Sequence, residues 1–267
     1  MNKNTMVNIE SLKFKYHQQQ VLNDVNFKVE KGKLYSIIGP NGSGKTTLLK
    51  IIAKQLETHV GKVEVAGELI EFYKYKDFAK QVALVPQNTS IDADFRNEEV
   101  VLMGRMPYLT PLARESKKDY DIVQEAMIKT NTVHLKNRLV EQISGGERQR
   151  IILARALAQA TPIMLLDEPV SQLDIQHQIG IMNLLRQLVD VEGLTAIVVL
   201  HDLNLASQYS DELLLLDKGK LVSKGIPETV LNPKLLKNVY GLTATIIENP
   251  VTKRPFILHV TCKEGEK

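Results

Sequence analysis

The sequence predicts an α/β protein with a largely parallel central sheet, an antiparallel N-terminal β-subdomain and an inserted helical subdomain. Short apolar runs recur along the chain, as expected for strands that are buried on both faces of a parallel sheet. One such run leads through a glycine-rich turn into a segment whose leucines and isoleucines recur at helical spacing. The chain has 267 residues, 43% hydrophobic and 24% charged. This composition is that of a globular protein, and a single domain, residues 1–267, is expected.

Charge and cysteine content narrow the function classes. The chain has 34 Lys and Arg against 31 Asp and Glu, a net charge of +3, which is too small and too dispersed to favour a nucleic-acid partner. The single cysteine, Cys262, excludes an internal disulfide and fits a reducing compartment. The longest strongly apolar runs, residues 163–166 and 196–200, are far shorter than the ~18 residues of a membrane span. A membrane role is therefore expected only through a partner.

The first third of the chain contains three predicted strands and one helix. Residues 7–14 and 21–29 alternate between apolar and polar side chains, which predicts two half-buried antiparallel strands. Residues 34–38 form a short apolar run that ends at Gly39-Pro40, which is typical of a buried strand running into a turn. A helix follows, because Leu48, Leu49, Ile51, Ile52 and Leu56 recur at helical spacing.

The rest of the chain divides into sheet-like and helical parts. Apolar runs at residues 82–85, 163–166, 195–200 and 213–216 predict further central strands. Between Gln87 and Ser144 there is no strand signal, and residues 121–129 place Ile122, Val123, Ala126 and Met127 on one helical face. We therefore expect a core of residues 1–87 and 160–245, a helical subdomain over 88–159, and a tail of residues 246–267 that is strand-like after Pro250.

The glycine-rich turn matches the pattern of a phosphate-binding loop. Its glycines let backbone N–H groups wrap around a phosphate at the positive end of the next helix. Lys45 can reach the β- and γ-phosphate oxygens, and the Thr46 hydroxyl can ligate Mg²⁺. The loop predicts binding of a nucleotide with Mg²⁺ through Gly39, Pro40, Asn41, Gly42, Ser43, Gly44, Lys45 and Thr46.

Two adjacent carboxylates follow a second strand. Asp167 and Glu168 come after the apolar run 163–166, and strand alternation is expected to point them in different directions. Asp167 then faces Mg²⁺ and Glu168 faces an attacking water. His201 follows another predicted strand, and a lone histidine at such a place is usually structural. Gln87 taken alone is typical of an ordinary loop residue.

One further motif connects these pieces. Residues 144–150, Ser-Gly-Gly-Glu-Arg-Gln-Arg, resemble the signature motif of the ATPase domains of ABC transporters, and the other motifs of that family occur in the expected order over residues 5–240. The resemblance implies that Tyr16 stacks on adenine, and that residues 39–47 are the Walker A loop. It also implies a Q-loop at Gln87, Walker B at Asp167 with the catalytic Glu168, a D-loop of residues 171–174 that includes Asp174, and a switch histidine at His201.

The resemblance implies a mechanism as well as a fold. The fold is that of a P-loop NTPase, whose RecA-like core carries the helical signature subdomain as an insert. The activity is ATP hydrolysis in a head-to-tail homodimer, in which Ser144, Gly145, Gly146 and Glu147 contact the partner's ATP. The catalytic residues are then Lys45, Gln87, Glu168 and His201, and the Mg²⁺ ligands are Thr46, Gln87 and Asp167. Ile143, Glu147 and Val170 depart mildly from the family pattern and leave its Ser-Gly-Gly core intact.

Two segments narrow the class of transporter. Residues 101–108 and 225–231 resemble stretches of ATPases that serve iron-siderophore, haem and vitamin B12 importers. The resemblance implies a peripheral protein on the cytoplasmic face of the membrane, bound to a permease dimer and indirectly to an extracytoplasmic substrate-binding protein, that drives uptake of an iron chelate. The alternative is a zinc, manganese or molybdate importer ATPase. We expect residues 101–108 to dock the permease, with Arg105 donating hydrogen bonds to it.

Overall fold

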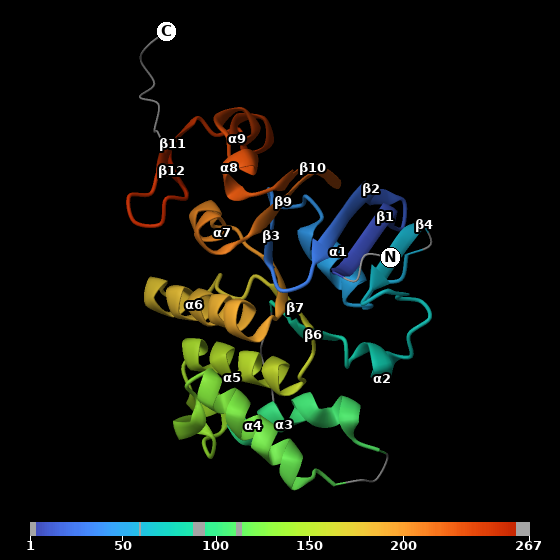
Figure 1. Cartoon of the computed structure of the whole chain (residues 1–267), viewed down its shortest axis with the longest axis vertical. Coiled ribbons are helices and arrows are strands. Elements are labelled where there is room, and N and C mark those ends of the chain that lie inside the picture. Colours follow the sequence, from blue (N-terminus) through green and yellow to red (C-terminus); the bar gives the residue numbers. More distant parts are fainter. Residues whose placement is uncertain (1–3, 59, 88–93, 111–113, 260–267) are drawn as a thin grey trace.

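The computed structural model describes residues 4–58, 60–87, 94–110 and 114–259, and a six-stranded sheet runs through its centre (Figure 1). The strand order is β10-β9-β3-β8-β7-β6, with all neighbours parallel except the antiparallel pair β9 and β10. This confirms the predicted parallel sheet. The strands are β3 (Leu34–Ile38), β6 (Val82–Val85), β7 (Ile163–Asp167), β8 (Thr195–Val199), β9 (Glu212–Asp217) and β10 (Lys220–Gly225).

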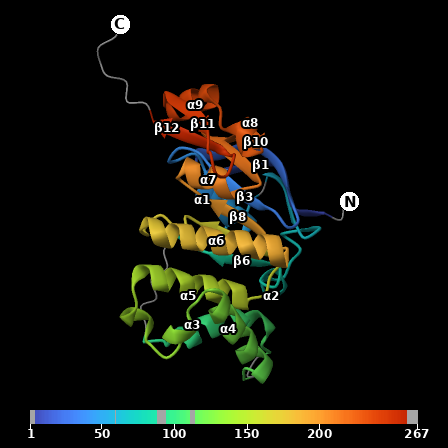
Figure 2. The same cartoon turned by 60° about the vertical axis from the view of Figure 1, so that its left-hand side comes forward.

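Helices cover one face of this sheet in successive layers. In Figures 1 and 2, α6 (Ile175–Glu192) lies next to the sheet, α5 (Gly145–Ala158) runs beside α6, and α3 and α4 lie beyond α5. Apolar residues of these helices and of the strands form one buried core. No helix in the described part of the chain is long and apolar enough to cross a membrane. The remaining helices are α2 (Tyr75–Phe78), α3 (Asn97–Leu102), η1 (Met103–Tyr108), α4 (Lys117–Lys129), η2 (Val133–Leu135), η3 (Val140–Gln142), α7 (Leu203–Tyr209), α8 (Pro227–Val230) and α9 (Pro233–Tyr240).

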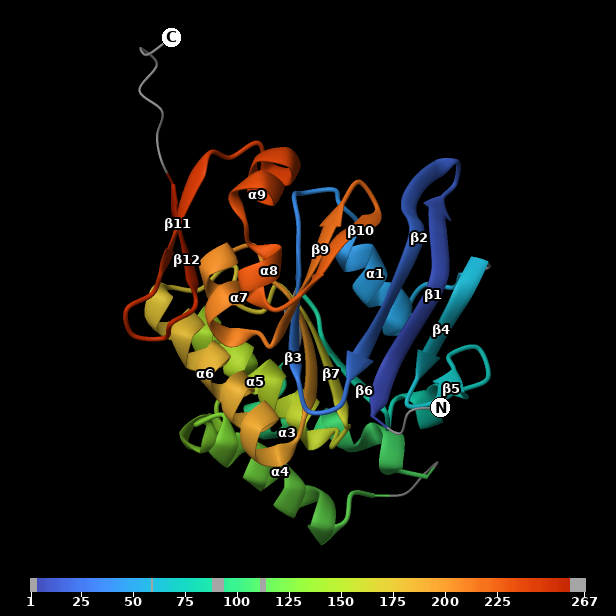
Figure 3. The ribbon, with the colours of Figure 1, turned by 45° about the horizontal axis from the view of Figure 1, so that its top comes forward.

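The other face is covered by an antiparallel sheet of order β2-β1-β4-β5 (Figure 3). The two predicted N-terminal strands are confirmed. They are longer than expected: β1 extends to Tyr16, which pairs with Gln19 of β2. Helix α1 lies between the two sheets, and its buried leucines share a second core with residues of both. The elements are β1 (Thr5–Tyr16), β2 (Gln19–Glu30), α1 (Lys45–Ile52), β4 (Val60–Val65) and β5 (Glu68–Leu69).

The helix predicted at residues 121–129 is present and begins earlier, at Lys117. Ser116 caps it: its hydroxyl and the side chain of Asp119 form a reciprocal capping box. A cap of this kind satisfies backbone N–H groups that the first turn leaves without partners.

Arg105 does not have the role expected from the sequence. Its side chain is buried, its Nε donates to Asp119 Oδ1 at 2.9 Å, and its Nη1 donates to the carbonyl of Ala158 at 2.8 Å. The guanidinium also lies over the Tyr108 ring, 4.0 Å from its centroid. Arg105 therefore joins η1 to α4 and α5 inside the protein, and the expectation that it donates hydrogen bonds to a permease is wrong. Its burial depends on tertiary packing, which an eight-residue motif does not reveal.

The tail forms a small hairpin. β11 (Ala244–Glu248) pairs antiparallel with β12 (Pro255–His259), which agrees with the strand-like pattern after Pro250, and the hairpin lies against α7 (Figure 3). Cys262 lies outside the described residues.

The Asp119 carboxylate predicts a measurable pH dependence of stability. Hydrogen bonds from Ser116, and then the bond from Arg105, lower its pKa from 3.8 to about 2. Because the folded-state pKa lies below the ordinary value, ionised Asp119 stabilises the fold above about pH 4, and this contribution is lost as the pH falls towards 2. The Asp119→Asn variant should therefore have a lower melting temperature than the wild type at pH 7. Between pH 4 and pH 2 its melting temperature should fall by less than that of the wild type.

The matched control is Asp121→Asn, a change of an exposed carboxylate on the same helix. Thermal melts across that pH range compare the three proteins. Equal acid-induced losses of melting temperature in Asp119→Asn and wild type would contradict the assignment.

Candidate functional site

The phosphate-loop sequence folds into a tight turn between β3 and α1. Gly39 follows the five buried residues of β3 and has a φ of +151°. A Cβ at this position would lie 2.1 Å from the carbonyl oxygen of Leu216 and 2.8 Å from Ser43 Oγ. Only glycine fits there. Gly44, with φ +102°, then sets the start of α1 at Lys45.

Lys45 folds back into this loop. Its Nζ donates to the carbonyl oxygens of Gly39 at 2.8 Å and Pro40 at 2.9 Å, and the residue is only 6% exposed. Burial lowers the pKa of Lys45, and the nearby charges of Glu168 and Asp167 oppose this shift. A buried ammonium that has only neutral carbonyl partners fits an anionic ligand at the same loop.

A carboxylate and a hydroxyl meet beside Lys45. Thr46 Oγ1 donates to Asp167 Oδ1 at 3.1 Å, and Asp167 is 5% exposed at the end of β7. Burial raises the pKa of Asp167, although the bond from Thr46 opposes the shift. Hydroxyl and carboxylate oxygens are the ligands that Mg²⁺ takes in proteins, and a cation would offset the cost of a buried negative charge. The two residues fit the expected metal.

Glu168 is the centre of a three-residue cluster. Gln87 Nε2 donates to its Oε2 at 2.7 Å, and His201 Nε2 lies 2.5 Å from its Oε1. The three residues follow β6, β7 and β8, which are neighbours in the sheet. The sequence predicted that strand alternation points the side chains of Asp167 and Glu168 in different directions. In the structure β7 ends at Asp167, and Glu168 lies beyond the strand with a left-handed φ of +50°, so strand alternation does not apply to this pair. Strained backbone of this kind is frequent at functional sites.

One cavity of about 420 Å³ opens over these groups. It brings together most of the residues that the sequence predicted for the loop, together with Glu168 and His201. Gln19 and Val21 of β2 also line it and carry no local signal in the sequence, since only the packing of the N-terminal sheet brings them there. The lining residues are Gln19, Val21, Asn41, Gly42, Gly44, Lys45, Thr46, Thr47, Glu168 and His201.

Tyr16 lies near this cavity without lining it. Its ring is 42% exposed and packs edge-on against Phe14, with the ring centroids 4.9 Å apart. Its cross-strand neighbour Gln19 is a lining residue. Stacking of Tyr16 on adenine stays a prediction.

The predicted signature residues start α5 and are not among the residues that line the cavity. Ser144 caps the helix, and its hydroxyl accepts from the Glu147 N–H in a capping box. Hydrogen bonds from the Ser144 backbone and hydroxyl lower the pKa of Glu147. Ser144 and Gly145 are exposed and Gly146 is buried. The structure therefore separates this group from the loop and from Glu168.

Gly146 is in contact with the first turn of α6. A Cβ at Gly146 would lie 2.5 Å from the ring of His177, a residue that no sequence motif indicated. Asp174 caps α6 by accepting from the His177 N–H at 2.9 Å, and its carboxylate lies 2.8 Å from His177 Nδ1. The hydrogen bond from the His177 backbone lowers the pKa of Asp174. His177 thus lies between the predicted D-loop and the predicted signature.

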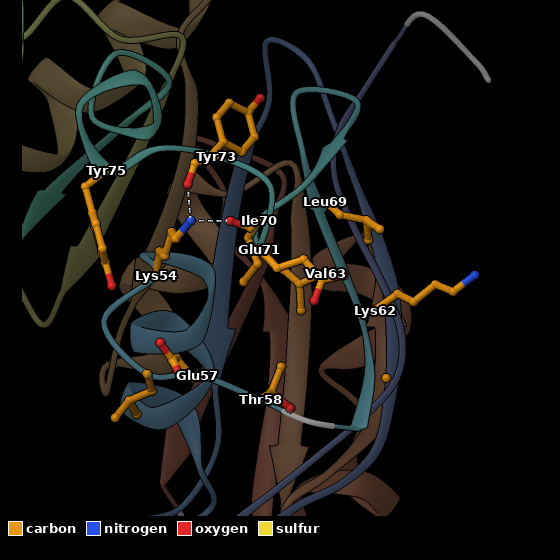
Figure 4. Close-up of a pocket in the computed structure, with 12 residues that line it drawn as sticks. Lys54, Glu57, Thr58, Lys62, Val63, Leu69, Ile70, Glu71, Tyr73 and Tyr75 are labelled. Carbon is orange, nitrogen blue, oxygen red and sulfur yellow. Dashed lines mark hydrogen bonds between the residues drawn. The ribbon is translucent and has the colours of Figure 1, made fainter.

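A second pocket, of about 410 Å³, lies away from this chemistry, between the end of α1 and the β4–β5 region (Figure 4). Lys54 at its wall donates to the carbonyl oxygens of Ile70 and Tyr73. Its ammonium is thus used within the fold, and none of the sequence-predicted site residues lines this pocket. The cavity over Lys45 and Glu168 is the better candidate site.

Comparison with known proteins gives a consistent result. A family model described as ABC transporter matches residues 22–171. The chain is 38% identical to the petrobactin import ATP-binding protein FpuC of Bacillus anthracis, over 98% of this chain and 96% of that protein. It is 39% identical to the ferric enterobactin transport ATP-binding protein FepC of Escherichia coli K12, over 93% and 92%. A solved ABC transporter assigned to the metal-chelate type, in an inward-facing conformation, aligns with a TM-score of 0.85 at 28% identity, over 97% of this chain and 98% of that one.

The turn at Gly39 yields a steric prediction. In Gly39→Ala the new methyl group meets a backbone carbonyl that cannot move aside, so the loop shifts and the dissociation constant for ATP should rise about tenfold or more, equivalent to about 1.4 kcal/mol. Gly67→Ala is the control, because Gly67 also has a positive φ, of +87°, but has open space around it and lies outside the site. Calorimetric titration with ATP measures both. Unchanged ATP binding in Gly39→Ala would show that the loop tolerates the methyl group.

Proposed function

Since the chain belongs to the ABC transporter family, we propose that it is the ATP-hydrolysing subunit of an importer that takes up an iron chelate. The observation that carries the proposal is the Glu168 cluster, held by Gln87 and His201 at the rim of the cavity that contains Lys45. FpuC and FepC, which match nearly the whole chain, are named for petrobactin import and for ferric enterobactin transport. These names favour an iron chelate over zinc, manganese or molybdate as the cargo.

Each residue of the site has a distinct task in hydrolysis. The loop amides and Lys45 hold the phosphates. To bind phosphate oxygens, the Lys45 ammonium breaks its hydrogen bonds to the carbonyls of Gly39 and Pro40. Thr46, Asp167 and Gln87 would hold Mg²⁺, which would neutralise charge on the phosphates. Glu168 accepts a hydrogen bond from the attacking water and removes its proton. His201 orients Glu168 through the 2.5 Å contact.

The signature residues act on a second molecule of ATP. Ser144 and Gly145 are exposed at the N-terminus of α5, where backbone N–H groups and the helix dipole favour an anion. They do not line the cavity of their own chain. A head-to-tail homodimer places them, with the adjoining Gly146 and Glu147, on the partner's ATP, and Asp174 lies at the same interface. In this arrangement residues 88–159 form the subdomain that carries the signature, and Tyr16 stacks on the adenine of its own site.

The docking surface for a permease lies beside η1. Met106 is 65% exposed and Tyr108 is 37% exposed, whereas Arg105 is buried beneath them. α2 lies next to this segment, because Lys76 of α2 donates to the carbonyl of Leu109, and its Tyr75 is 69% exposed. These three apolar side chains, Tyr75, Met106 and Tyr108, are called the α2–η1 surface. It binds a permease at the cytoplasmic face of the membrane, and the permease receives cargo from a substrate-binding protein.

The assignment of Glu168 is tested by Glu168→Gln. The amide cannot take a proton from water, so turnover should fall by about 100-fold or more. Binding of ATP should persist, and the variant should elute as an ATP-bound dimer in gel filtration. Lys45→Ala is the contrasting variant, and it should weaken ATP binding itself. Turnover at the wild-type rate in Glu168→Gln would exclude this role for the residue.

The α2–η1 surface is tested by Met106→Glu. A charge in an apolar contact is costly, so co-purification with the permease and cargo uptake in cells should both fall, while ATP hydrolysis by the purified subunit stays within about twofold of wild type. Ile128→Glu, at an apolar residue of α4 that is similarly exposed at 61%, is the control and should leave all three measurements unchanged. If Met106→Glu retains co-purification and uptake, the permease binds elsewhere.

A further inference from the structure

The C-terminal hairpin is joined to α7 by side chains from both elements. Asn204 of α7 accepts from the backbone N–H of Ile257 at 2.7 Å, and its amide group donates to the carbonyl of the same residue at 3.2 Å. Adjacent antiparallel strands exchange two bonds in this way. The Asn204 side chain therefore acts as a partner for the outer edge of β12.

A second set of contacts lies one turn further along α7. The hydroxyl of Ser207, which is fully buried, donates to the carbonyl of Pro255 at 2.6 Å. Arg254 of the hairpin donates to the carbonyl of Ser210 at 2.6 Å and to that of Ser207 at 3.4 Å. A cation that binds the last carbonyls of a helix satisfies acceptors that have no partner within the helix and also interacts favourably with its dipole.

α7 needs such support because it is short. It has seven residues, and isolated helices shorter than about 12 residues are marginal in water. Its N-terminal cap is Asp202, which accepts from the N–H groups of Asn204 and Leu205. His201 directly precedes this cap and follows Leu200, whose N–H donates to the carbonyl of Ile37 in β3. The His201 backbone is therefore held between the sheet on one side and α7 on the other.

His201 itself has little other restraint at its side chain. The side chain is 41% exposed, and its one described hydrogen-bonding contact is with Glu168. We infer that the hairpin of β11 and β12 braces α7 and that Asn204 is a positioning residue for His201. The inference rests on the proposed function, because it assigns to the hairpin an effect on ATP hydrolysis through the Glu168–His201 contact.

The test is a double-mutant cycle on ATP hydrolysis. Asn204→Leu removes both bonds to Ile257 and should lower kcat about tenfold, with the KM for ATP changed by less than about twofold, because the phosphate loop is untouched. In a His201→Ala background the same change should lower kcat no further, since a residue that acts through His201 has no effect once His201 is absent. A helix that merely stabilises the fold would give the same fold-loss in both backgrounds.

A second variant keeps the test decisive if Asn204→Leu does not fold. Arg254→Met removes the cation from the end of α7 and should show the same dependence on His201. Lys253→Met is its matched control, because Lys253 is the neighbouring cation, is exposed, and pairs only with Glu248 among the described residues. It should retain wild-type kcat and KM.

The outcomes separate this inference from the function on which it rests. Equal loss of kcat in both backgrounds, or wild-type kcat in Asn204→Leu and Arg254→Met while His201→Ala is impaired, overturns the brace and leaves the ATPase assignment intact. Absence of ATP hydrolysis by the wild-type chain in complex with its permease overturns the proposed function itself, and the brace with it.

Discussion

The parallel pairing of β7 with β6 and β8 is the constraint on which the candidate site depends. The register pairs Val85 with Leu166 and Asp167 with Val199, so the chain leaves all three strands at the same edge of the sheet. Side chains from three distant parts of the sequence, Gln87, Glu168 and His201, meet there as a result. Ligand sites at the carboxyl ends of parallel strands are a general consequence of such sheets.

The two buried ions of the site, Lys45 and Asp167, have neutral hydrogen-bond partners and no partner of opposite charge in the described structure. Lys45 and Asp167 are both buried. Burial lowers the pKa of Lys45 and raises the pKa of Asp167, and both shifts favour the neutral form of the side chain. They do not form an ion pair with each other in the described structure: Lys45 binds two carbonyls, and Asp167 binds Thr46. Phosphate and Mg²⁺ would supply the missing opposite charges, which makes the ligand-bound state electrostatically complementary to this arrangement.

The phosphate loop and the acidic pair could be predicted from the sequence, because they lie in short local patterns, whereas Gln87 and His201 were indicated only by the resemblance to the ABC family. The loop from Gly39 to Thr47, and the acidic pair that follows β7, each combine a strand end with a distinctive composition. Gln19, His177 and Asn204 carry no such signal. They reach their positions through the packing of a sheet edge, a helix pair and a hairpin, which involve residues far apart in the sequence.

Arg105 is a residue for which the sequence predicted a role that the structure contradicts. The pattern around it predicts a docking segment, yet the guanidinium points inward, towards Asp119 and the carbonyl of Ala158. The surface role was inferred from a resemblance over residues 101–108 and from the hydrogen-bond donors of the guanidinium, and neither of these indicates burial. The α2–η1 surface is nevertheless arranged by Arg105, which fixes Tyr108 by stacking on its ring.

The contact between Gly146 and His177 constrains how the chain can vary. The two positions share one small volume, since any side chain at 146 would occupy the space of the imidazole ring. Helix packing therefore favours glycine here, independently of the role proposed for the start of α5. A side chain at 146 would require the His177 ring, which is 38% exposed, to turn outwards or to be replaced by a smaller group. Residues 146 and 177 should therefore covary across relatives, and enlarging the glycine alone would disturb the packing between α5 and α6.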